Sequence, residues 1–232
     1  MPVADQRAAV FARIREAVKV KAPHLHAHVV EEKEEHRVPG AETYREWLPS
    51  VGTSRAEQIE LFAQNSVGLK TEFYRVPSLE EAGRQLAAIA QEAKWERVAT
   101  HRHPLAEKLT ERLMLPYMIT DDGYAVSDLE SSHAAITGCD YVIAQTGTLL
   151  VSAGTAGGRA LSVLPPHHVV IAREDQVVPD LAAALDLAAE RYAGKWPSFL
   201  SFITGPSRTG DIERILVLGA HGPKRLTVFL LP

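Results

Sequence analysis

The feature that most constrains the fold of this 232-residue chain is a series of short apolar runs, each of which stops at a cluster of Gly, Thr, Ser or Arg. Apolar runs bounded by turn residues are typical of buried β-strands. The second half of the chain therefore predicts a sheet whose strands end in glycine-rich loops. The runs are Tyr141–Ala144, Leu149–Val151, Val169–Ile171, Phe199–Ile203 and Ile215–Leu218.

Three glycine-rich loops accompany these strands. They read TGT at Thr146–Thr148, AGTAGGR at Ala153–Arg159 and TGPSRTGD at Thr204–Asp211. Loops at strand ends are where α/β proteins place their ligands. We therefore expect the three loops to form one site that binds a small anion.

The same part of the chain resembles a known family. The stretches ITGCDYVIAQTGTLLVSAG, SVLPPHHVVIAREDQVVP, FITGPSRTGDIE and LVLGAHGPKRLTVFLL occur in one order between residues 136 and 231. Together they resemble the lactate-utilisation protein C family, the LUD-domain proteins, and the GPSRT, DIE and GAHGP combination is the specific part. The resemblance implies an α/β fold similar to the ribose-phosphate isomerase and CoA-transferase group. It also implies a role in bacterial oxidation of L-lactate to pyruvate beside iron–sulfur partner proteins.

Charge and hydropathy exclude several classes of protein. The chain has 25 Lys and Arg against 29 Asp and Glu, a net charge of −4, whereas a nucleic-acid binder or a polybasic membrane binder needs a basic surface. No apolar run approaches the length that crosses a bilayer. The N-terminal residues are charged throughout and lack the apolar core of a signal peptide. We expect a soluble, cytoplasmic protein without membrane insertion.

Cysteine content limits the redox chemistry of the chain. Cys139 is the one cysteine, so four thiolates from this chain cannot hold an iron–sulfur cluster. We expect no cofactor bound by this chain alone, with iron–sulfur clusters on partner proteins. Cys139 precedes a predicted strand without a neighbouring His or Lys, which favours a buried, inert thiol.

The order of helix and strand signals predicts the fold class. Strands at 71–76, 97–100 and 115–119 alternate with helices at 79–93 and 104–113, which is typical of a mostly parallel sheet covered by helices. Residues 1–68 read as an N-terminal helical arm and loop, and residues 69–232 as the α/β domain. Further helices are predicted at 3–20, 53–67, 128–136 and 179–193, and a last strand at 225–231.

The TGPSRTGD loop carries the strongest candidate site. Backbone N–H groups after Gly205, with the hydroxyls of Ser207 and Thr209, suit a carboxylate or phosphate. Arg208 adds a planar, two-pronged donor that matches a carboxylate. The alternative is a turn in which Ser207 and Asp211 cap the backbone.

The TGT loop has two interpretations. Gly147 lets the backbone approach a ligand while Thr146 and Thr148 offer hydroxyls, or the tripeptide is a tight hairpin turn. Related LUD proteins often carry an acidic residue where Gln145 stands here. Since Gln145 cannot act as the glutamate nucleophile of CoA-transferases, this difference disfavours acyl transfer.

The AGTAGGR loop offers Gly154 and Arg159 to an anion, with a flexible connection as the alternative. It matches neither the P-loop nor the dinucleotide fingerprint, which argues against a nucleotide site. His221, between glycines at a strand end, is the histidine we expect to move a proton, with a structural role in the turn as the alternative. His167 and His168 enter a strand, so we expect one to face the core and the other to face solvent.

His24, His26 and His28 alternate in a polar segment and raise the question of a metal site. No acidic or cysteine ligand stands at motif spacing, so we expect a solvated loop and no metal.

Three functions remain open from the sequence. The first is a subunit of a lactate-oxidising system that binds a small carboxylate or phosphate. The second is a stand-alone isomerase or acyl-transfer enzyme, and the third is a scaffold without catalysis.

Overall fold

The computed structural model describes residues 11–13, 15–16, 19, 49–209, 217–219 and 221–232. The chain divides into two compact units, Met1–Trp47 and Leu48–Pro232. The described residues of the first unit are helical, in agreement with the helix predicted there. His24, His26, His28 and Asp211 lie outside the described residues.

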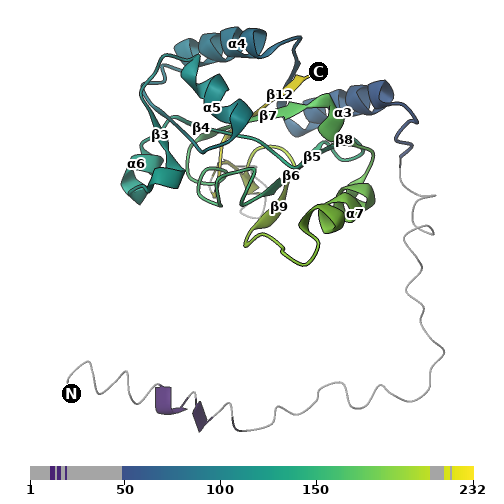
Figure 1. Cartoon of the computed structure of the whole chain (residues 1–232). Helices are drawn as coiled ribbons and strands as arrows, with labels where there is room; N and C mark the ends of the chain where they lie inside the picture. Colours follow the sequence, from purple (N-terminus) through teal and green to yellow (C-terminus); the bar gives the residue numbers. More distant parts are fainter. Residues whose placement is uncertain (1–10, 14, 17–18, 20–48, 210–216, 220) are drawn as a thin grey trace, which may run out of the picture. The chain divides into compact units, whose positions relative to one another are not determined.

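A six-stranded parallel sheet forms the centre of the second unit (Figure 1). All five of its strand pairs are parallel, which confirms the predicted fold class. The strands lie in the order β1 (Glu72–Arg75), β12 (Arg225–Leu231), β7 (His167–Arg173), β4 (Ala134–Thr137), β2 (Val98–Thr100) and β3 (Tyr117–Ile119).

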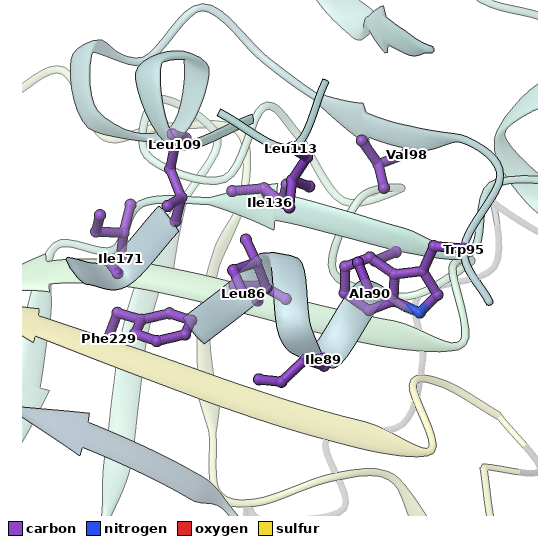
Figure 2. Packing of buried hydrophobic residues seen from close by; sticks show 14 of the residues in the cluster. Leu86, Ile89, Ala90, Trp95, Val98, Leu109, Leu113, Ile136, Ile171 and Phe229 are labelled. Atoms are coloured by element: carbon purple, nitrogen blue, oxygen red, sulfur yellow. The ribbon is translucent and has the colours of Figure 1, made fainter. Parts of the chain in front are cut away.

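Helices α4 (Leu79–Glu92) and α5 (Pro104–Glu111) pack against one face of this sheet. The hydroxyl of Ser78 caps α4 by accepting from the Glu81 N–H, which satisfies a free donor of the first turn. Figure 2 shows side chains of α4 and α5 meeting those of β4, β7 and β12 in one apolar cluster. The labelled residues are Leu86, Ile89, Ala90, Trp95, Val98, Leu109, Leu113, Ile136, Ile171 and Phe229.

A second, four-stranded sheet covers the other face together with helix α3 (Arg55–Leu69). Apolar side chains of α3, β5 and β6 pack there against those of β7 and β12. Helix α7 (Leu181–Tyr192), capped by Asp180, covers the outer face of the second sheet. The strands of that sheet lie in the order β8 (Val177–Val178), β5 (Tyr141–Ile143), β6 (Thr148–Ser152) and β9 (Leu200–Ile203).

Helix α3 belongs to the α/β unit. It begins at a capping box formed by Ser54 and Glu57, and its Ile59 and Phe62 are buried in the core between the layers. The compact unit consequently starts before α3, at Leu48, whereas we predicted a boundary after this helix, between residues 68 and 69.

The segment predicted as one helix over residues 128–136 is divided in the structure. Helix α6 ends at Glu130, having begun at Val126, and residues Ala134–Thr137 form β4 between β2 and β7. The helix prediction was therefore wrong for the second half of this segment. The remaining elements are η1 (Thr120–Asp122), η2 (Glu174–Gln176), and the paired strands β10 (Arg208–Thr209) and β11 (Val217–Leu218).

In the part of the chain that the structure describes, every helix is too short or too polar to cross a bilayer.

Candidate functional site

Four residues of the predicted site line a single cavity of about 340 Å³. Gly205 and Ser207 come from the loop after β9, Arg208 begins β10, and His221 comes from the loop before β12. This volume lies within the range of small-molecule pockets. The structure thus brings the GPSR and GAHGP motifs together where β10 starts and its antiparallel partner β11 ends.

The cavity lies at the carboxyl end of β9 but at the amino ends of β7 and β12. His168 and Leu226, which are register partners near the starts of β7 and β12, form part of its wall. We expected the loops to meet at the ends of strands in one sheet. They meet differently because β9 belongs to the second sheet, which packs across the first.

Arg208 is fixed by the C-terminal end of α3. Its Nη2 donates a hydrogen bond to the carbonyl oxygen of Leu69, the last residue of that helix. A cation is favourable there because the free carbonyl groups of a helix end carry partial negative charge. A guanidinium has five N–H donors, so donors remain for a ligand in the cavity.

Gly205 makes this contact possible. Its φ of +76° lies in the left-handed region, and an added Cβ would lie 2.9 Å from the Leu69 oxygen and 3.0 Å from Arg208 Nη2. A side chain at this position would therefore collide with the Arg208–Leu69 pair.

Backbone hydrogen bonds hold Ser207 between the two loops of the cavity. Its N–H donates to the carbonyl of Pro223, and its carbonyl accepts from the Gly219 N–H. The Ser207 hydroxyl has no hydrogen-bond partner among the described residues, and it lines the cavity beside the exposed His221. Thr209 pairs through its backbone with Val217 in the β10–β11 ribbon.

The electrostatic character of the cavity favours an anion. Arg208 is the charged residue among its described lining residues, and that lining contains neither Asp nor Glu. An ionised carboxylate bound there would meet a guanidinium, a free hydroxyl and an imidazole without opposing charge.

The TGT tripeptide is a hairpin turn that adjoins the cavity. Strands β5 and β6 pair antiparallel across it, and Gly147 adopts a φ of +62° against Asn65 and Leu69 of α3. The Thr146 hydroxyl donates to Thr148 Oγ1 at 2.7 Å, and Thr148 Oγ1 lies 2.9 Å from Thr204 Oγ1. Since Thr204 lines the cavity, the TGT hydroxyls support its wall through Thr204.

The two residues of the AGTAGGR loop that we predicted to bind an anion lie outside the cavity. Gly154 is exposed, and the Arg159 guanidinium donates to the carbonyl of Ser198 at 3.3 Å and lies over the ring of Phe199. Neither residue lines the cavity that contains Arg208.

A polar side chain of the AGTAGGR loop forms a hydrogen bond with a buried carboxylate. Asp140 is fully buried and accepts a hydrogen bond from the Thr155 hydroxyl at 2.8 Å. The Tyr192 hydroxyl lies 2.5 Å from Asp140 Oδ1, and Arg191 forms an ion pair with the same oxygen at 3.4 Å. Burial raises the pKa of Tyr192, with the Asp140 hydrogen bond adding to the effect. These contacts satisfy the carboxylate internally, which indicates a structural role.

His168 lines the cavity but was not among the site residues predicted from the sequence. We predicted that one of His167 and His168 would face solvent, but both are buried because helices cover one face of the sheet and the second sheet covers the other. His167 packs against the Trp95 ring, whereas His168 lines the cavity. A histidine at the start of a long apolar run in a doubly covered sheet is the signal that would have identified it.

A larger groove of about 510 Å³ lies between α4 and α5. Exposed, charged side chains such as Arg84 and Lys108 line it, and Arg84 forms an ion pair with Glu81 of its own helix. It contains none of the predicted site residues, so we regard the smaller cavity as the candidate site. Among the described residues, no group of three or more His, Cys, Asp or Glu side chains is arranged to hold a metal ion.

Comparison with known proteins identifies the family. A sequence model of the LUD domain matches residues 59–231. The chain is 36% identical over 106 residues to lactate utilization protein C of Deinococcus radiodurans, and the match covers 45% of this chain and 49% of that protein. It is 28% identical over 177 residues to the protein of the same name from Shouchella clausii, covering 73% of this chain and 77% of the relative.

The match to the Deinococcus radiodurans protein spans about half of that relative's length, and the same holds for lactate utilization protein C of Bacillus subtilis, at 32% identity over 45% of that protein. Among solved structures, a DUF162 family protein from Deinococcus radiodurans superposes with a TM-score of 0.63 at 26% identity, covering 78% of this chain and all of the other. The fold, the cavity motifs and a family match over most of the chain agree: this protein belongs to the LUD domain family.

Proposed function

We propose that this protein acts in lactate utilisation, as a cytoplasmic subunit that binds a small carboxylate in the Gly205–Ser207–Arg208–His221 cavity. The observation that carries the proposal is the cavity itself, in which free donors of Arg208 and Ser207 surround a space whose described lining holds no acidic side chain. The relatives named lactate utilization protein C support L-lactate or pyruvate as the carboxylate.

In this proposal the partner proteins carry the redox centres. Cys139 is the one cysteine of the chain, and it is buried. We therefore propose that iron–sulfur proteins of the same system accept the electrons. The role of this chain is to hold the carboxylate, with the exposed His221 as the group that exchanges a proton at the cavity.

The competing functions have weaker support. Gln145, in the turn where acyl transfer would require a carboxylate nucleophile, uses its side-chain amide to donate to the carbonyl of Pro49 at 2.9 Å. A scaffold without a ligand would have no need for uncommitted donors that converge on one cavity.

Calorimetric titration of L-lactate, pyruvate, acetate and phosphate into the purified chain tests the binding step. Arg208→Ala should weaken carboxylate binding about ten- to a hundredfold, since one charge-assisted hydrogen bond is lost. Arg208→Lys should restore only part of the affinity, because an ammonium cannot form the two-pronged contact.

Arg159→Ala is the matched control, because Arg159 is held at Ser198 and Phe199 outside the cavity. Reconstitution with the iron–sulfur partners, followed by L-lactate-dependent dye reduction, tests the oxidation step. Equal binding by wild type and Arg208→Ala would contradict the proposed site. Stoichiometric iron in the purified chain would contradict the proposed division of roles.

A further inference from the structure

His168 is a buried histidine in which one ring nitrogen has a hydrogen-bond partner and the other has none among the described residues. It is 1% exposed, and its Nε2 lies 2.8 Å from Thr137 Oγ1. Nδ1 has no hydrogen-bond partner among the described residues, and His168 lines the cavity. By contrast, Nδ1 of His167 is sealed from solvent and also lacks a described partner, on the opposite face of the sheet.

The Thr137 hydroxyl determines which nitrogen of His168 carries the proton. This hydroxyl has one hydrogen, which it donates to the carbonyl of Gly138 at 3.0 Å. We therefore assign the contact with His168 as one in which Nε2–H donates and Thr137 Oγ1 accepts. In the neutral ring, Nδ1 then carries a lone pair and no hydrogen, so it can accept a hydrogen bond but cannot donate one.

The ring remains neutral near physiological pH. Burial is the main cause that lowers the pKa of His168 to about 3, and the positive charges of protonated His167 and His101 contribute to the same shift. His168 and Arg208 line the same cavity, so the neutral ring can offer an acceptor at Nδ1 while Arg208 offers donors.

We propose that His168 Nδ1 accepts the hydroxyl hydrogen of a 2-hydroxy carboxylate whose carboxylate group is held by Arg208. This inference rests on the proposed function and deepens it, because it assigns a residue that distinguishes hydroxy acids from their relatives. A 2-oxo acid would place a carbonyl oxygen against the Nδ1 lone pair, and a deoxy acid would leave Nδ1 without a partner. Both should bind less tightly than the hydroxy acid.

The test is calorimetric titration of L-lactate, pyruvate and propionate into the full chain. Wild type should bind L-lactate about tenfold more tightly than propionate, as expected for one hydrogen bond to a buried acceptor. His168→Gln keeps an amide N–H that can reach Thr137 but has no acceptor at the position of Nδ1. This variant should bind L-lactate and propionate equally.

His167→Gln is the matched control, since the same change on the opposite face of the sheet should leave the preference for L-lactate intact. A His168→Gln variant that retains the preference would overturn the inference, and so would a wild-type protein that binds the two acids equally. In that last case propionate binding still supports the carboxylate site. If neither acid binds, the proposed function fails and the inference fails with it.

A second measurement covers the case in which His168→Gln does not fold. Ring ¹⁵N NMR of the wild-type chain should show His168 with a protonated Nε2 and a bare Nδ1. L-lactate should shift the Nδ1 resonance more than propionate does. A protonated Nδ1 would overturn the proposal without the use of any variant.

Discussion

Arg208 and Leu69 are separated by 139 positions in the sequence, yet the guanidinium of the first donates to the main-chain oxygen of the second. The contact joins the candidate site to the last turn of α3, the helix whose Asn65 also donates to the carbonyls of Ala144 and Gln145 beside the TGT turn. One helix end therefore holds two loops of the site. Changes at this junction should alter stability and ligand binding together.

Gly205→Ala tests the junction. The new Cβ would meet the Leu69 oxygen and the Arg208 guanidinium in a left-handed backbone conformation, so we expect a loss of about 1–3 kcal/mol in unfolding free energy together with weaker carboxylate binding. Gly158→Ala is the control, because its φ of +90° imposes a similar backbone strain while no atom lies within 4 Å of the added Cβ. Urea unfolding and calorimetry measure the two effects. Equal ligand affinity in both variants would show that Gly205 does not position Arg208.

Tyr192→Phe tests the buried carboxylate. The change removes the hydroxyl that contacts Asp140 and leaves a fully buried charge with one partner fewer, so we expect a loss of about 1–3 kcal/mol in unfolding free energy. Tyr141→Phe is the comparison, because the Tyr141 hydroxyl has no hydrogen-bond partner among the described residues and its loss should change stability little. Since Asp140 lies outside the cavity lining, lactate affinity should remain at the wild-type value in both variants.

The alternation of strands and helices from β1 to β3 was predictable because its signals are local. Ser78 caps α4, Pro104 begins α5, and the apolar positions of each element lie on one face. The strand β4 was not predictable in this way. Its sequence, AAIT, combines two alanines, which are depleted in strands, with Ile and Thr, which are enriched there, so its place between β2 and β7 decides that it is a strand.

The second sheet and His168 were missed for a related reason. Short apolar runs indicate strands but not which sheet each strand joins, so the sequence could not show that β9 leaves the parallel sheet. Ser207, Arg208 and His221, which line the cavity, were predicted as candidates because Gly, Ser and Arg cluster around them in the sequence. His168 enters the cavity only because the two sheets pack together.

Stability should fall in mild acid. Burial is the main cause that lowers the pKa of His101 and His167 to about 4 and that of His168 to about 3, against an ordinary value of 6.5. The unfolded chain therefore takes up protons first as pH falls, and stability that is present above pH 6.5 is lost as pH falls toward about 4. Each histidine contributes at most about 1.4 kcal/mol per pH unit in this window.

Urea unfolding at pH 7.5, 6 and 5 measures this slope, and His167→Gln should reduce it. An unfolding free energy that stays constant from pH 7 to pH 5 would show that these histidines titrate normally in the folded protein.

The Cys139 thiol should be inert in the folded protein. Cys139 is 1% exposed, and burial raises the pKa of its thiol, so little thiolate is present to react. A thiol-specific dye should label the native chain slowly and the urea-unfolded chain at the rate of a free cysteine. Rapid labelling of the native chain would mean that the segment after β4 opens readily.

The position of β12 has a consequence for the order in which the sheet can form. This strand is the most C-terminal of the six, yet it lies inside the sheet, between β1 and β7, and all of its residues beyond Arg225 are buried. Until β12 is in place, β1 has no neighbour in the sheet, and β7 presents an open, apolar edge. A chain truncated before β12 would therefore lose an interior strand and expose a surface on which other chains can aggregate.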